Sequence, residues 1–388
     1  MLAMASSPLQ RSIDLAAALR PTRHARVVFR TDGPRPLGHD AATKAAVARD
    51  IAELLGLPFS DDPADAREGH APYLVPCEPI AGLDAAARLG VQGPEDLFGG
   101  VVPQGFMASK VITHGLVGRA AIAPAGWPAA LGRQLLEVVL PGYTAFSKRD
   151  ARLAGERLLR GGPVRLKCAE GVGGSGQTVA TNGTELARQI DAIDAALIRR
   201  VGWVLERNLV GQVVTHSVGA VHIGPWRAAY CGQQTTTVDR RGHEVYGGSR
   251  LLVARGGFRE LLDLELPPST RLAVAQAMRY DHAARAACAG MFASRVNYDV
   301  AQGLDANGKP LSGVLEQSWR IGGASGAEVA ALLAFKEDPA LRSIVASTHE
   351  VHADAVAVPP GARIHYDAVD PKLGRLTKYT TVERHGDA

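Results

Sequence analysis

Cysteine is scarce in this sequence, which has four among its 388 residues: Cys77, Cys168, Cys231 and Cys288. They are far apart and form no C-x-x-C pair, so the sequence indicates neither a zinc site nor a disulfide framework. A reducing compartment suits such a chain, and we expect a cytoplasmic protein.

Long apolar runs and blocks of one charge are also missing. No run of about 18 apolar residues occurs, which excludes a membrane-spanning helix. Arg11 and Asp14 interrupt the apolar positions near the N-terminus, so no signal peptide is predicted. The 43 Lys and Arg against 39 Asp and Glu give a net charge of +4, spread along the chain. We therefore expect a small-molecule substrate rather than nucleic acid or a membrane as the partner.

What is present is a mixture of strand and helix patterns. At about 150 residues per domain, the length predicts two or three domains. A strand at residues 25–29, a helix over Ala41–Leu55 and an extended run at Tyr73–Pro76 indicate a small α/β unit that ends near residue 115. Further strands are predicted at Val164–Lys167, Thr178–Ala180, Trp203–Glu206, Val213–Ile223, Trp226–Thr237, Val296–Val300 and Val314–Gln317. Further helices are predicted at Lys148–Arg160, from Thr184 through Leu197, at Ser269–Phe292 and at Ser325–Phe335.

A glycine-rich loop separates two of these strands. Gly171, Gly173 and Gly176 match G-x-G-x-x-G, but a dinucleotide-binding loop opens a helix, whereas residues 177–180 favour a strand. A P-loop would need lysine where Gln177 stands, and it too requires a helix afterwards. The local sequence fits both interpretations poorly.

A third interpretation is a hairpin that folds over nucleotide phosphates. Its backbone N–H groups would donate to phosphate oxygens, and Lys167, which shares a strand face with Arg165, would add a positive charge. The alternative is a surface hairpin without a ligand. Strands on both sides of the loop agree with a hairpin.

Two carboxylates are predicted to face each other on a later hairpin. A two-residue turn at Asn307-Gly308 places Asp299 directly opposite Glu316. The same register pairs Asn297 with Ser318. Like charges directly opposite destabilise a sheet unless something binds between them, and Mg²⁺ prefers one or two carboxylates plus phosphate oxygens. The alternative is a solvated strand face with two ordinary acids.

The segment after this hairpin carries an arginine and the start of a helix. Ser325 and Glu328 match the S-x-x-E capping box, so a helix is expected to begin there. Arg320 lies near its amino end, where it would hold a phosphate or a carboxylate. The alternative is an ordinary surface arginine.

Together these motifs resemble the ATP-grasp superfamily over about Pro141 to Phe335. The spacing of the lysine and the glycine loop is similar to that of biotin carboxylase, and the whole chain resembles an uncharacterised bacterial ATP-grasp-like family. The resemblance implies ATP and Mg²⁺ as cofactors. The nucleotide-binding residues that it implies are Lys148, Lys167, Gly171, Gly173, Gly174, Ser175, Gly176, Gln177, Glu206 and Leu209. The implied metal ligands are Asp299, Glu316 and Ser318, and the implied catalytic residues are Lys167 and Arg320.

The resemblance also implies an α/β (α+β) fold in which two α+β lobes enclose the nucleotide. A small α/β pre-ATP-grasp domain would precede them at residues 25–115, after an extension at residues 1–24. The N-lobe would cover residues 116–205 and the C-lobe residues 206–340, followed by a C-terminal segment at residues 341–388.

The implied activity is that of an ATP-dependent carboxylate ligase, which joins an acid to an amine or a related nucleophile through an acyl-phosphate. Arg250 and Arg295 are candidate ligands for the carboxylate substrate. The alanine-rich helices are compatible with a homodimer. Ser175 replaces a basic loop residue of the carboxylase, Ser318 replaces an asparagine metal ligand, and Val213 replaces a ribose-binding acid. The last two departures favour an alternative, a catalytically weak nucleotide-binding or regulatory protein.

One further pattern points to different chemistry. His349-Glu350-Val351-His352 would suit a metal-dependent hydrolase if both histidines lay on one helix face. Its spacing is not that of H-E-x-x-H, and ordinary exposed helix histidines are the alternative.

Overall fold

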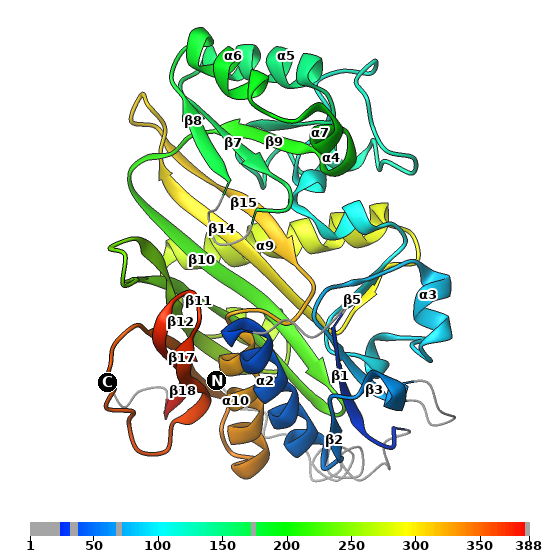
Figure 1. Ribbon diagram of the computed structural model, residues 1–388, viewed down its shortest axis with the longest axis vertical. Helices are drawn as coiled ribbons and strands as arrows, with labels where there is room; N and C mark the ends of the chain where they lie inside the picture. The colour runs from blue at the N-terminus through cyan, green and yellow to red at the C-terminus, as the bar shows by residue number, and fades with distance from the viewer. Residues whose placement is uncertain (1–23, 32–37, 67–71, 172–175, 385–388) are drawn as a thin grey trace, which may run out of the picture.

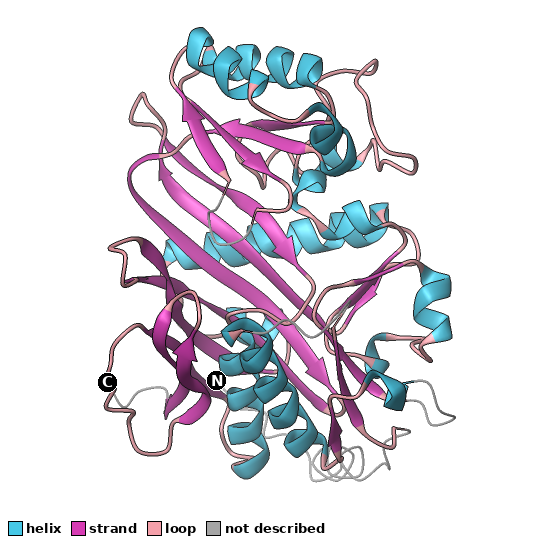
Figure 2. Cartoon of the chain, in the orientation of Figure 1, coloured by secondary structure: helices cyan, strands magenta, loops and turns pink. Residues whose placement is uncertain are grey.

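The computed structural model describes residues 24–31, 38–66, 72–171 and 176–384 (Figure 1). This part of the chain forms strands of four sheets and helices that pack on them, a mixture that the sequence patterns predict (Figure 2). No helix among the described residues is long and apolar enough to cross a membrane.

The largest sheet has eight antiparallel strands in the order β15-β14-β10-β11-β12-β16-β18-β17. Its strands are β10 (Val210–Ile223), β11 (Trp226–Val238), β12 (Glu244–Arg255), β14 (Arg295–Leu304), β15 (Pro310–Ser318), β16 (Ser343–Val351), β17 (Arg363–Asp370) and β18 (Gly374–Arg384). The strands after residue 341 therefore extend the same sheet that carries the acid hairpin.

Helices cover both faces of this sheet. On one face lie α8 (Phe258–Leu262) and α9 (Pro268–Ala287), and their apolar side chains join Val218, Tyr298 and Val300 in one buried core. On the other face lie α2 (His39–Leu55) and α10 (Ser325–Glu337). Helices α2 and α10 cover only the lower part of this face in Figure 1, and the smaller sheets lie beside its upper part.

A four-stranded antiparallel sheet, in the order β6-β9-β7-β8, lies above the large one in Figure 1. Its strands are β6 (Gly142–Ala145), β7 (Val164–Cys168), β8 (Gln177–Ala180) and β9 (Trp203–Arg207). Three helices accompany it, α5 (Lys148–Leu159), α6 (Gly183–Asp191) and α7 (Ala195–Val201). The single helix predicted from Thr184 through Leu197 is wrong, because the side chain of Asp194 accepts from Leu197 N at 2.7 Å and starts a second helix.

The N-terminal part forms two small sheets. β1 (Val27–Arg30), β2 (Phe59–Ser60) and β3 (Tyr73–Pro76) are parallel, with β1 in the centre. In the second sheet β5 (Gly100–Val102) is central and pairs with β4 (Ile80–Ala81) and with β13 (Phe292–Ala293), so a strand just before the acid hairpin belongs to this sheet. The remaining elements are α3 (Leu83–Arg88), α4 (Leu131–Gln134) and the 3₁₀ turns η1 (Pro63–Ala66), η2 (Pro94–Asp96), η3 (Gly105–Ala108) and η4 (Lys110–Thr113).

Candidate functional site

The predicted pairing of two acids across a hairpin is present in the structure. β14 and β15 pair with Asp299 opposite Glu316 and Asn297 opposite Ser318. Because side chains alternate along a strand, all four lie on the face of the large sheet that α10 covers in part. The hairpin therefore presents two carboxylates side by side.

The loop and the strand geometry that produce this register differ from the expected two-residue turn. The loop spans residues 305–309, so Leu304 pairs with Pro310 and the strands leave the loop one residue out of the expected register. A bulge then adds Leu315 to β15 and brings Glu316 into its pairing. Without the bulge, Glu316 would point to the opposite face.

Asp299 accepts several hydrogen bonds. Its Oδ1 atom accepts from Asn297 Nδ2 and Gln234 Nε2, each at 3.0 Å, and from Ser217 Oγ at 3.4 Å. Burial and the neighbouring Glu316 carboxylate nevertheless raise the pKa of Asp299 to about 6. Two negative charges at this place are costly, which is the condition that favours a bound cation.

Glu316 is paired with a lysine that the sequence motifs do not include. Lys110, on η4, places its Nζ atom 2.6 Å from Glu316 Oε2 and donates to the carbonyl oxygen of Gly171 at 2.8 Å. Its side chain is 7% exposed, against 34% for Glu316. The one signal in the sequence was a lysine between two apolar pairs, Met107-Ala108 and Val111-Ile112.

Lys167 and Glu206 form a buried ion pair between β7 and β9. His114 adds a contact of 3.3 Å between its Nε2 atom and Glu206 Oε2. Burial alone would raise the pKa of Glu206, but the Lys167 ammonium and the His114 imidazole lower it to about 2. Glu206 is therefore an anion in the folded chain, and Lys167 points toward it from β7, the strand that precedes the glycine loop.

The structure describes only the two ends of the glycine loop. Gly173, Gly174 and Ser175, predicted to bind phosphate, lie outside the described residues. Gly176 has a φ of 68°, which suits glycine, and Gln177 pairs with Lys167 across β7 and β8. Gln177 Oε1 also accepts from Arg165 at 3.0 Å. Leu209, one of the implied nucleotide-binding residues, is buried in a small apolar cluster.

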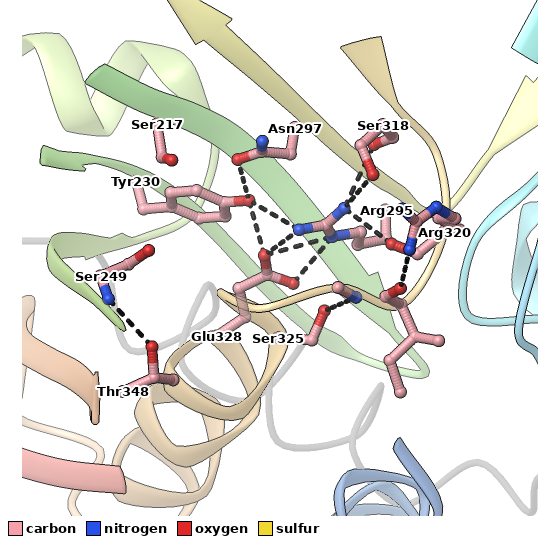
Figure 3. A network of polar contacts seen from close by, with 12 residues as sticks. Ser217, Tyr230, Ser249, Arg295, Asn297, Ser318, Arg320, Ser325, Glu328 and Thr348 are labelled. Carbon is pink, nitrogen blue, oxygen red and sulfur yellow. Dashed lines mark hydrogen bonds and ion pairs between the residues drawn. The ribbon is translucent and has the colours of Figure 1, made fainter. Parts of the chain in front are cut away.

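Arg295 is buried and fully occupied by protein partners (Figure 3). Its Nε atom lies 3.1 and 3.0 Å from the two carboxylate oxygens of Glu328, and its Nη2 atom lies 2.6 Å from Oε1. Its Nη1 atom donates to the carbonyl oxygens of Ser318 at 3.2 Å and Arg320 at 2.7 Å. The predicted role as a substrate ligand would require the loss of these contacts, and the geometry is that of a brace between β14 and α10.

The helix start also differs from the prediction. Ser325 and Glu328 do not form a capping box: Ser325 Oγ accepts from Gly322 N at 3.0 Å, and Ala324 is the N-cap of α10. Glu328 turns to Arg295 instead, because burial of both charges favours a forked pair.

Arg320 lies on the loop between β15 and α10. Its Nε atom is 3.2 Å from Glu78 Oε2, and its side chain is 23% exposed. Pro79, next to Glu78 in the chain, lines a cavity of about 350 Å³. Arg30 and Arg88 line the same cavity, which opens where β1 and β3 end.

Two predicted site residues lie apart from this group. Lys148 Nζ donates to the carbonyl oxygen of Asp191 at 2.9 Å in an exposed contact between α5 and the end of α6. Arg250 is exposed and its Nη2 atom is 3.3 Å from Glu383 Oε2. The neighbouring Ser249 pairs with Gln234, whose side chain donates to Asp299. Because side chains alternate along a strand, Arg250 lies on the opposite face of the sheet from Asp299.

The His349–His352 pattern does not form a helical metal motif. His349 lies on strand β16, where its ring stacks on Tyr379 with centroids 4.6 Å apart. Across the part of the chain that the structure describes, no group of three or more His, Cys, Asp or Glu side chains is arranged to hold a metal ion. The strongest candidate for a cation site is therefore the pair Asp299 and Glu316, where a bound substrate would have to supply the remaining ligands of the cation.

Comparison with solved structures identifies the fold. N5-carboxyaminoimidazole synthetase from Staphylococcus aureus, complexed with ADP, is 10% identical, with 96% of each chain covered and a TM-score of 0.53. A second structure of that enzyme is 11% identical over 93% of this chain and 94% of that one, with a TM-score of 0.51. Phosphoribosylamine–glycine ligase from Thermotoga maritima is 15% identical over 93% and 92%, with a TM-score of 0.45. The chain has the ATP-grasp fold, as the motifs predict.

The family is shown by the sequence itself. Residues 27–380 match the family described as "Protein of unknown function (DUF3182)", and the chain belongs to it. No curated protein matches the sequence. The fold and the site geometry therefore carry the functional argument.

Proposed function

We propose that this protein is an ATP- and Mg²⁺-dependent carboxylate ligase that works through an acyl-phosphate. The observation that carries the proposal is the acid pair Asp299 and Glu316, facing each other with two buried lysines, Lys110 and Lys167, on the adjoining segments. Paired acids beside lysines suit the triphosphate of a nucleotide bound with a divalent cation. The similar synthetase from S. aureus was crystallised with ADP, which supports the choice of nucleotide.

The residues at the hairpin fit a magnesium ion. Burial and the neighbouring Glu316 carboxylate raise the pKa of Asp299, so its ionised form is unfavourable without a cation, and Glu316 is partly exposed. We assign these two carboxylates as the principal ligands; Ser318 Oγ, the third implied ligand, instead accepts from Arg295 Nη1 at 3.3 Å. When bound there, Mg²⁺ would neutralise charge on phosphate oxygens.

The nucleotide would lie between the two larger sheets. Lys167 and the backbone N–H groups of the glycine loop would donate to phosphate oxygens and stabilise the charge of the transferred group. Glu206 and the backbone beside Leu209 would face the adenine, as the resemblance to ATP-grasp proteins implies. The buried Lys167–Glu206 pair holds both side chains in place before any ligand arrives.

The acid substrate would bind near Arg320. This arginine is partly exposed, and among the described residues its ion-pair partner is Glu78, whereas Arg295 is enclosed by Glu328 and by the carbonyl oxygens of Ser318 and Arg320. The cavity lined by Pro79, the residue after Glu78, is also lined by Arg88. This surrounding favours a substrate with a carboxylate or another anionic group.

The test is release of ADP from Mg-ATP with a panel of carboxylic acids and amines. We expect turnover with at least one acid and amine pair, and its loss in Glu316→Gln. A matched control is Glu383→Gln, an exposed acid on the opposite face of the same sheet, which should keep full turnover. Binding of ATP without turnover by any pair would instead indicate a nucleotide-binding protein.

A further inference from the structure

The backbone around Lys110 is anchored to both of the larger sheets. From the large sheet, Gln317 Nε2 donates to the carbonyl oxygens of Met107 at 3.1 Å and Ser109 at 2.7 Å. From the smaller sheet, Thr144 Oγ1 donates to the carbonyl oxygen of Val111 at 2.6 Å. The segment that carries Lys110 is thus fixed between β15 and β6, and its side chain has little freedom in direction.

The ammonium group of Lys110 meets two motifs that are remote in the sequence. It lies 2.6 Å from Glu316 on the acid hairpin and 2.8 Å from the carbonyl oxygen of Gly171, where the glycine loop begins. A buried ammonium needs such partners, because its desolvation is costly without them. The ammonium group of Lys110 therefore links the acid hairpin to the first residue of the glycine loop.

The ammonium group of Lys110 partly compensates the negative charge of the pair Asp299 and Glu316. Without Lys110, Asp299 and Glu316 would face each other as two carboxylates with no compensating ammonium at Glu316. A divalent cation at the same carboxylate would bring like charge close to the ammonium, at a distance where charges interact strongly. The two cations cannot both make a close contact with Glu316 at low cost.

We propose that Lys110 is a positioning residue whose ammonium group occupies the place of the divalent cation at Glu316 in the nucleotide-free protein. In that state the same ammonium group also donates to the carbonyl oxygen of Gly171. The inference rests on the proposed function and deepens it, since it predicts the affinity of the site for a divalent cation in the absence of nucleotide. A divalent ion without nucleotide must displace Lys110 and binds weakly. Displacement from Glu316 also weakens the hydrogen bond from Lys110 to the carbonyl oxygen of Gly171, so cation binding and the loss of this contact are coupled.

The experiment measures binding of Mn²⁺ alone, by electron paramagnetic resonance of the free ion, in wild type and in Lys110→Met. Removal of the competing charge should raise the affinity for Mn²⁺ by about tenfold or more in the absence of nucleotide. Lys44→Met is the matched control, because Lys44 is also a buried lysine paired with a carboxylate, Asp40, at 2.9 Å. An Mn²⁺ affinity in folded Lys110→Met that equals or falls below that of wild type would overturn the proposal.

A measurement on the wild type decides the question if Lys110→Met fails to fold. Acetylation of lysines by acetic anhydride, read by mass spectrometry, reports whether each ammonium is engaged. Acetylation of Lys110 should increase several-fold when Mn²⁺ saturates the site, while that of Lys44 should stay constant. Unchanged acetylation of Lys110 at saturating Mn²⁺ would refute the displacement.

The two proposals fail in different ways. If wild type does not bind Mg-ATP, the proposed function fails whatever the Mn²⁺ titrations give. If wild type binds Mg-ATP while Lys110→Met gains no affinity for Mn²⁺, only the role of Lys110 fails.

Discussion

Lys167 and Glu206 form a buried ion pair across neighbouring strands, and each side chain is less than 6% exposed. Both residues were predicted to contact a nucleotide, one at its phosphates and the other at its adenine. The structure adds that they contact each other and that His114 completes the group. An interaction this well buried should be visible in the stability of the protein without any ligand.

The first prediction concerns the pH dependence of that stability. The pKa of Glu206 falls from 4.5 to about 2 on folding, so its ionised form stabilises the fold above pH 4.5, and this contribution is lost as the pH falls toward 2. Glu206→Gln leaves Lys167 unpaired and should lower the free energy of unfolding at pH 7 by roughly 3 kcal/mol. Urea unfolding across this pH range should show the difference from wild type shrinking below pH 4.5. A difference that does not change with pH would contradict the assignment of the charge.

The second prediction is that one site substitution stabilises the ligand-free protein. Asp299 has a pKa raised to about 6, so its ionised form opposes folding, and the destabilisation grows as the pH rises from 3.8 through 6. Asp299→Asn removes this charge and should raise the free energy of unfolding by about 1 kcal/mol at pH 8, with little effect near pH 4. The same variant should lose Mg²⁺-dependent stabilisation by ATP. Urea unfolding without metal at the two pH values checks the first part, and equal or lower stability at pH 8 would count against it.

The third prediction separates the two arginines near the hairpin. Arg295→Met leaves Glu328 buried without its partner and should cost roughly 4 kcal/mol of stability. Arg320→Met breaks a partly exposed pair with Glu78 and should cost less than about 1 kcal/mol. Urea unfolding of both variants measures the contrast. Equal losses of stability would show that Arg320 is a structural brace as well, and would remove the reason to place it at the substrate.

Much of the acid hairpin could be predicted from the sequence, because strand pairing is local and side chains alternate with a period of two. The pairing of Asp299 with Glu316 is confirmed, yet it depends on a longer loop and on a bulge at Leu315 that cancel each other. Neither has a clear pattern in the sequence. The pairing of Asp299 with Glu316 therefore agrees with the prediction, although the loop and the bulge differ from a simple two-residue turn.

Lys110 and Arg295 show where prediction from the sequence ends. The partners of Lys110 are Gly171 and Glu316, which only the packing of two sheets brings to the same place. From the sequence Arg295 is a candidate ligand for the carboxylate substrate, but its Nη2 atom lies 2.6 Å from Glu328 Oε1 on α10. Whether a charged side chain is free for a ligand depends on tertiary partners, and these have no fixed spacing along the chain.

The central claim is tested most directly by calorimetric titration of Mg-ATP into wild type and Glu316→Gln, with Glu383→Gln as control. We expect wild type and the control to bind ATP with an affinity that depends on Mg²⁺, and Glu316→Gln to lose that dependence. At 100 times its Kd, the ligand should add about 2.7 kcal/mol to the stability of wild type. No binding of ATP by folded wild type, with or without Mg²⁺, would contradict the assignment of this site.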